Sequence, residues 1–106
     1  MNNRIINIEA GKPYRWEQGK KLKALQDVLV IFPAEILIDG ATIGSIIELS
    51  REDVNVYFQK QSEQDEKTSI IVFELPEGTT MKIKRNVEML AKPKTGTVAA
   101  FEECAI

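Results

Sequence analysis

Apolar and polar side chains alternate along the run VNVYFQK. Such alternation is typical of a β-strand with one buried face, because successive side chains of a strand point to opposite sides of the sheet. The first set is Val54, Val56 and Phe58, and the second set is Asn55, Tyr57 and Gln59. The pattern predicts that the first set faces the interior and that Tyr57, on the other face, can contact a partner.

Short apolar runs of the same kind recur from Val28 to the end of the chain, separated by residues that favour turns. The runs are VLVIF, AEILI, ATIGSIIELS, VNVYFQK, SIIVFEL, TMKIKRNVEML and TVAAFEE. Asp39-Gly40 predicts a hairpin between the second and third runs, and the polar run Gln61–Thr68 predicts an exposed loop. Six or seven short strands at a spacing of about ten residues predict an all-β domain, a small antiparallel barrel or sandwich.

Helical periodicity is weak throughout the chain. The helical candidate is WEQGKKLKALQ (Trp16–Gln26), in which two leucines lie three residues apart and Gly19 lowers the helix propensity. We therefore expect residues 1–19 to form an N-terminal extension, partly helical, and residues 20–106 to form the β domain around a single core.

Arg85 interrupts the apolar face of the run TMKIKRNVEML. If this run is one strand, Met81, Ile83, Val87 and Met89 face inward and Arg85 faces inward with them. Burying an unpaired guanidinium is costly. We expect either a bulge that turns Arg85 outward or a position at the barrel mouth beside an acidic partner, where Arg85 would line a site.

The composition argues against several kinds of chemistry. Of 106 residues, 28% are charged and 43% are hydrophobic, and none is histidine. Zinc sites and Ser-His or Cys-His nucleophile pairs rely on histidine, and the sequence has no Gly-rich phosphate loop or nucleophile elbow. We therefore expect a protein that is not an enzyme and that needs no metal or cofactor.

The sequence also favours one compartment. It contains no run of 18 apolar residues and no secretory signal with an apolar core. Cys104 is the only cysteine, so no internal disulfide can form. We expect a cytoplasmic location and no membrane insertion.

Charge is unevenly distributed along the chain. Residues 1–27 hold six basic and three acidic side chains, whereas residues 28–106 hold eight and thirteen. A basic leader on an acidic body is either a solvated terminal segment or a binding segment for an anionic partner. Nucleic-acid binding through residues 12–23 would have only Tyr14 and Trp16 to stack on bases, so we expect it least.

Several parts follow one another in a distinctive order. A hydrophobic strand through Phe32-Pro33 precedes a tight hairpin, a strand that ends in an acid-x-Ser segment, a second hairpin and a last strand that begins GTVAAF. In this order, and in GTVAAF, which approximates a Gly-Val-Gly-Val-x-Phe segment, the chain resembles the PilZ domain family from about Lys20 onward. The resemblance implies a six-stranded antiparallel barrel from bacteria that binds the second messenger cyclic di-GMP.

Two motifs bind cyclic di-GMP in the PilZ family, an Arg-x-x-x-Arg segment before the first strand and an [Asp/Asn]-x-Ser-x-x-Gly segment after the second. Counted back from the first strand, the two arginine positions fall on Lys23 and Asp27 of this chain. The second motif becomes ELSRED, which places Glu48, Ser50 and Asp53 at the motif positions. After Ser50 the chain has a turn of three charged residues, Arg51-Glu52-Asp53. The resemblance explains this charged turn as a PilZ-type turn that has lost its glycine.

These exchanges weaken the implied ligand site. An aspartate in place of an arginine repels a doubly anionic ligand, and the other two carboxylates add to this repulsion. Four other cations are candidates to assist in binding the ligand: Arg15, Lys20, Lys21 and Arg85. Lysine lacks the planar fork with which arginine stacks on guanine, so we expect cyclic di-GMP binding to be weak or absent.

The leading hypothesis is a non-enzymatic PilZ-like regulatory or adaptor module that acts through contacts with a protein partner. Members of that family with incomplete motifs act in motility, in pilus assembly or as partners of signalling proteins. The alternatives are a functional cyclic di-GMP receptor with an unusual pocket and a small β-barrel that binds nucleic acid.

Overall fold

The computed structural model describes residues 4–60 and 69–104, which form ten β-strands in two antiparallel sheets. Sheet I consists, in spatial order, of β1 (Arg4–Glu9), β10 (Val98–Cys104), β3 (Lys21–Ala24), β8 (Thr80–Ile83) and β5 (Ile47–Leu49). Sheet II consists of β2 (Tyr14–Trp16), β9 (Val87–Pro93), β4 (Val28–Pro33), β7 (Ser69–Leu75) and β6 (Asn55–Lys60). The mainly β fold predicted from the sequence is confirmed, with ten strands in place of six or seven. The loop predicted over Gln61–Thr68 lies outside the described residues.

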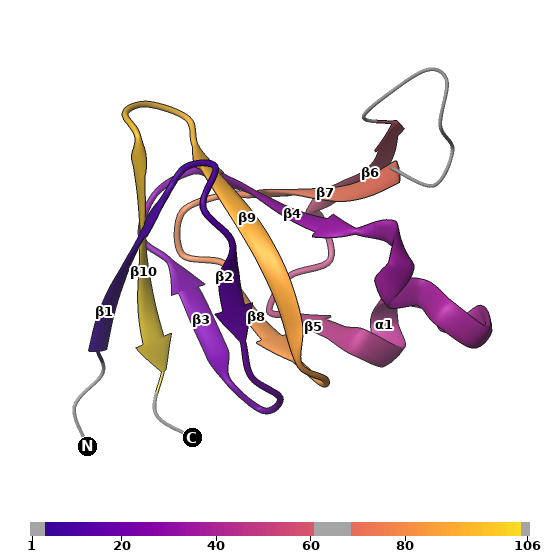
Figure 1. Cartoon of the computed structure of the whole chain (residues 1–106). Helices are drawn as coiled ribbons and strands as arrows, with labels where there is room; N and C mark the ends of the chain where they lie inside the picture. The colour runs from indigo at the N-terminus through magenta and orange to yellow at the C-terminus, as the bar shows by residue number, and fades with distance from the viewer. Residues whose placement is uncertain (1–3, 61–68, 105–106) are drawn as a thin grey trace.

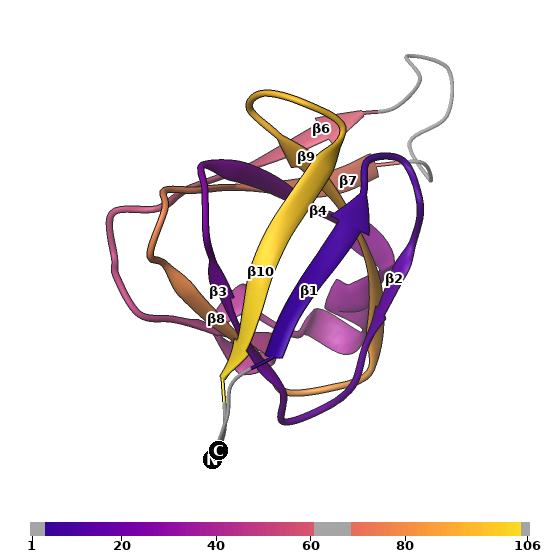
Figure 2. The same cartoon turned by 90° about the vertical axis from the view of Figure 1, so that its left-hand side faces the viewer.

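The hydrophobic core lies between the two sheets. Figure 1 shows β1, β10 and β3 at one end of the molecule, with β6 and β7 reaching away at the other. In Figure 2, β10 and β1 cross in front of strands β9 and β4. The largest core side chains are Trp16, Phe32, Phe73 and Phe101. The rings of Phe32 and Phe73 meet edge to face with their centroids 5.5 Å apart, and the Trp16 ring stacks on Phe32 at 6.2 Å.

The N-terminal segment belongs to the two sheets rather than to an extension. β1 pairs with β10, and β2 pairs with β9, while Ile6 and Ile8 contribute to the core. The helix expected over Trp16–Gln26 does not form, because a turn with Gly19 at φ 89° leads into β3. Both predictions were wrong. β2 and β3 are too short to show a period, the alternation of β1 was not recognised, and pairing with distant strands stabilises all three.

Two short helical segments replace the hairpin expected at Asp39-Gly40. A 3-10 helix, η1, spans Ala34–Gly40, and α1 spans Ile43–Ile46. Gly40 adopts φ 74° at the end of η1, as glycine commonly does where a helix stops. A short apolar run such as AEILI does not distinguish a strand from a buried helical turn, which explains the wrong prediction.

Arg85 lies in a turn, because the run TMKIKRNVEML forms two strands, β8 and β9. The Arg85 Nη1 atom donates a hydrogen bond of 2.7 Å to the carbonyl oxygen of Ile36 in η1. The neighbouring Lys84 Nζ donates at 3.1 Å to the carbonyl oxygen of Gly44 in α1. The bulge and the acidic partner predicted for Arg85 are therefore both replaced by a contact that holds the helical segments to this turn.

The alternation predicted for β6 is present, but the core ends before Phe58. Val54 and Val56 pack against the core, whereas Phe58 is 60% exposed although it pairs with the buried Ile71. Tyr57 is 38% exposed on the other face. The interior position predicted for Phe58 is wrong because β6 is an edge of sheet II, and no described strand lies beyond it.

The difference between a buried and an exposed phenylalanine can be measured by truncating one side chain of each kind. Phe73→Ala empties a fully buried site and should lower the free energy of unfolding by about 3–5 kcal/mol. Phe58→Ala removes an exposed ring and should cost less than about 1 kcal/mol. Denaturant melts of the two variants test the placement, and a loss for Phe58→Ala equal to that for Phe73→Ala would contradict it.

Candidate functional site

The five positions implied by the PilZ resemblance border the turn between β7 and β8 on two sides. Lys23, Glu48 and Ser50 lie on or next to strands of sheet I, whereas Asp27 and Asp53 lie at one end of sheet II. The turn between β7 and β8 separates the two groups. On one side its Glu77 N–H donates to Asp27 Oδ1, and on the other side Thr80 pairs with Ser50.

The sheet I group forms part of an ordinary solvated sheet face. The Ser50 hydroxyl oxygen accepts a hydrogen bond of 2.9 Å from the Thr80 N–H, so its role is to extend the pairing of β8. Lys23 lies opposite Thr80 on the other side of β8. Glu48 pairs with Lys82 across the strands. Along these strands, polar residues on the outer face thus alternate with buried residues on the inner face, as expected for a sheet with one side in water.

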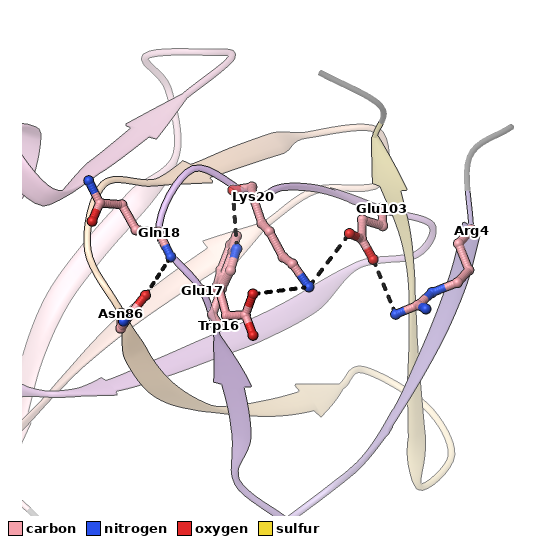
Figure 3. A network of polar contacts seen from close by, with 7 residues as sticks. All are labelled: Arg4, Trp16, Glu17, Gln18, Lys20, Asn86 and Glu103. Atoms are coloured by element: carbon pink, nitrogen blue, oxygen red, sulfur yellow. Dashed lines mark hydrogen bonds and ion pairs between the residues drawn. The ribbon is translucent and has the colours of Figure 1, made fainter. Parts of the chain in front are cut away.

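Lys20, an expected auxiliary cation, belongs to a structural network shown in Figure 3. Its Nζ lies 3.7 Å from Glu103 Oε1 and 3.9 Å from a Glu17 oxygen, and its carbonyl accepts the Trp16 indole N–H. Arg4 Nη2 lies 3.3 Å from Glu103 Oε2. That oxygen is buried and accepts no aligned hydrogen bond from a described residue, so the guanidinium balances its charge by proximity. The network ties β1 and β10 to the β2–β3 turn.

The remaining expected cations are dispersed. Arg15 is exposed on β2 and pairs with Glu88 of β9. Lys21 is exposed on β3, in sheet I. Lys21 nevertheless lies beside Lys23 on the outer face of sheet I and pairs with Lys82, which also pairs with Glu48. The cations next to the implied ligand positions are therefore lysines, and the two expected arginines lie elsewhere. Trp16 is buried, so it cannot stack on a base as the nucleic-acid hypothesis requires.

A trough of about 510 Å³ lies at the end of sheet II. It is lined by Asp27, Val28, Leu29, Asp53, Asn55, Glu74, Leu75, Pro76, Lys92, Pro93 and Lys94. The register places Lys92, Leu29, Glu74 and Asn55 in one row across the outer face of the sheet. Three strand spacings separate the ends of this row, about 14 Å. The trough therefore has an apolar floor with two lysines on the β9 side and two carboxylates, Glu74 and Asp53, toward β6. The third carboxylate, Asp27, lies beside Lys94, whose N–H donates to the Asp27 carbonyl oxygen.

Each trough carboxylate has a donor within the described structure. Asp27 Oδ1 accepts the Glu77 N–H at 2.8 Å, and Glu74 Oε2 accepts from Asn55 Nδ2 at 3.3 Å. Asp53 accepts two hydrogen bonds from the guanidinium of Arg51. Asp53 is thus paired with a cation, whereas Asp27 and Glu74 accept from neutral N–H groups and keep their negative charge.

The trough lysines differ from the carboxylates. Lys92 and Lys94 are both exposed, and neither forms an ion pair with another described residue at 4 Å or less. Lys92 lies on β9 and Lys94 directly follows its last residue, so their Cα atoms are about 7 Å apart. The trough can therefore accept an additional anionic group at its β9 side. Neither lysine was singled out from the sequence, where each is one of many surface cations.

An apolar row crosses sheet II directly beside the trough. Cross-strand pairing places Leu90, Ile31, Val72 and Tyr57 next to one another on the outer face. Val72 is only 1% exposed although it is not part of the core cluster. The flanking residues Leu29 and Ile70 are half-buried. The sequence signal for this row was the unbroken apolar character of VLVIF and SIIVF, which indicates strands covered on both faces.

No family model, curated protein or solved structure matches the chain. The PilZ resemblance therefore stays a prediction from the sequence. Among the described residues, no group of three or more potential ligands could hold a metal ion. Within residues 4–60 and 69–104, no helix has the length and apolar character needed to cross a membrane.

The charged turn after β5 provides a prediction about ionisation. The hydrogen bonds from Arg51 lower the pKa of the Asp53 carboxyl below its ordinary value. Arg51→Gln should return that pKa to the ordinary value in an NMR titration, whereas Arg15→Gln should leave it unchanged. A group with a lowered pKa stabilises the fold above its ordinary pKa, and this contribution disappears as the pH falls through the lowered one. An Asp53 pKa that does not respond to Arg51→Gln would contradict the pairing.

The residues at the motif positions predict weak cyclic di-GMP binding. Calorimetric titration at moderate salt should show no dissociation constant below about 10 μM, equivalent to roughly −7 kcal/mol. The reason is that Asp27 and Asp53 place carboxylates where the implied site has an arginine and a glycine. A saturable titration with a sub-micromolar constant would contradict this prediction and favour the receptor hypothesis.

Proposed function

We propose that this chain is a non-enzymatic adaptor module that binds a protein partner through the outer face of sheet II. The observation that supports the proposal is the apolar row Leu90, Ile31, Val72 and Tyr57 beside a trough with unpaired lysines. On the outer face of sheet I, strands β3, β8 and β5 carry mainly charged and hydroxyl side chains. The exposed apolar residues of that face, Ile5 on β1 and Val98 on β10, each pair with a glutamate and form no row.

Burial energetics favour a covered face. Apolar surface removed from water stabilises a complex by about 25 cal/mol per Å² before the costs of association are subtracted. Aromatic side chains are common anchors of protein interfaces, and Tyr57 presents its ring at the end of the apolar row. The same argument supports the partner role expected for Tyr57 from its alternation in the sequence.

The charges of the trough define the chemistry of the partner. Its carboxylates already accept hydrogen bonds, while Lys92 and Lys94 have no described acidic partner. The complementary ligand is a protein segment whose apolar side chains cover the apolar row and whose acidic residue reaches the two lysines. A basic segment would meet those lysines with like charge.

The order of sequence parts supports a PilZ-like identity for this adaptor. Such an identity implies a bacterial cytoplasmic protein in cyclic di-GMP signalling, with motility as one process that it could serve. The proposed binding face does not require the nucleotide, since it is built on β4, β7 and β9 rather than on Lys23, Glu48 and Ser50.

Peptide selection tests this function directly. A random peptide library displayed on phage should yield binders that combine apolar residues with at least one acidic residue. With one such peptide in a fluorescence anisotropy titration, Lys92→Gln combined with Lys94→Gln should weaken binding about tenfold or more. Raising the salt concentration should weaken binding to the unaltered chain as well.

A matched control uses the other sheet. Lys21→Gln combined with Lys23→Gln removes two lysines with the same spacing from β3 and should leave peptide binding unchanged. Selection of basic peptides, or equal losses for the two double variants, would contradict the proposed face.

A further inference from the structure

β6 is an edge strand with few of the usual features that block pairing. Residues 54–59 contain no charged residue and no proline, and the charged residue of β6, Lys60, stands at its end. Natural edge strands are commonly protected by charges, proline or bulges, because their open backbone groups can pair with another strand. Phe58 is 60% exposed on this strand, and Figure 1 shows β6 and β7 reaching together away from the rest of the molecule.

The other three edges of the two sheets are less suited to pairing. β2 and β5 contain three residues each. β1 has six residues, but Arg4 and Glu9 stand at its ends and each forms an ion pair. β6 therefore has the longest uncharged run among these described edges, residues 55–59.

We propose that two copies of this chain pair through β6, antiparallel, around a two-fold axis at Tyr57. In this register Val56 lies opposite Phe58 of the second copy, so each exposed phenylalanine ring gains an apolar neighbour on the core side. Tyr57 meets Tyr57 of the second copy on the outer face, and Asn55 lies opposite Gln59. Apolar residues thus face apolar ones and amides face amides.

Adjacent registers are less complementary. A side chain must pair with one on its own face, so the axis can move only by one whole residue along the strand. An axis at Phe58 sets the charged Lys60 opposite Val56. An axis at Val56 pairs only three residues of the strand Asn55–Lys60. The axis at Tyr57 pairs the five uncharged residues 55–59 with one another, and it sets Lys60 opposite Val54 only beyond the start of the strand.

The paired strands would join the two copies of sheet II into one continuous sheet. The apolar row ends at Tyr57, so the rows of the two copies would meet there and form a single longer row. This inference goes beyond the proposed function and does not depend on it, because the pairing uses the strand edge and the partner segment uses the sheet face. A contact limited to one strand pair buries little area, so we expect a weak, concentration-dependent dimer.

Cysteine cross-linking tests the register. Directly opposite residues of antiparallel strands have Cα atoms about 4.5–5.5 Å apart, within the range that a disulfide can bridge. In a Cys104→Ser background, Tyr57→Cys should form a disulfide-linked dimer on mild oxidation. Gln59→Cys alone should not, since its two copies would lie about 13 Å apart along the strand. A mixture of Asn55→Cys and Gln59→Cys should yield the mixed dimer.

Sedimentation equilibrium of the unaltered chain supplies the second measurement. Association should increase with concentration, and Phe58→Lys, which alters an exposed position, should weaken it by roughly tenfold or more. A monomer at every concentration, or equal cross-linking of Tyr57→Cys and Gln59→Cys, would overturn the proposal. Loss of the dimer in Phe58→Lys with retained binding of a selected peptide would separate this interface from the proposed partner face.

Discussion

The alternation of side chains along β4 and β7 determines most of this structure. Val30 and Phe32 of β4 point into the core, and Phe73 of β7 meets them there. Because a strand turns every second side chain to its other face, Ile31 and Val72 must then lie on the outside of sheet II. A shift of either strand by one residue would exchange the two faces and expose the core set to water. The apolar outer face is thus fixed by the same register that builds the core.

The candidate site follows from where this sheet ends. Beyond the apolar row, Lys92 of β9 and Lys94, directly after β9, line the trough together with Glu74 of β7. The carboxylates accept hydrogen bonds from nearby donors, and the two lysines form no ion pair at 4 Å or less with a described residue. The result is a surface with an apolar strip beside charges of both signs, features that favour a protein segment over a nucleotide.

The sequence predicted β6, β7 and β10 well, because their apolar runs are bounded by turn residues such as Gly78, which adopts φ 91°. The run TMKIKRNVEML reads as one strand but forms two, β8 and β9. The short strands β2 and β3 show no period, the alternation of Ile6 and Ile8 in β1 was not recognised, and the apolar run of η1 reads equally as strand or helix. Phe58 was misplaced because alternation gives the face of a residue but not where the core ends. The trough was only half anticipated: Asp27 and Asp53 do line it, but the lysines that define its chemistry come from a distant strand.

The central claim is that the partner segment lies on the outer face of sheet II. NMR chemical-shift mapping with a peptide selected by the chain tests this claim most directly, since backbone amides report contact without any substitution. The account predicts that the largest shifts occur in β9, β4 and β7, at Leu90, Lys92 and Ile31 and their neighbours. Shifts concentrated on β3 and β8 of sheet I, around Lys23 and Thr80, would contradict it.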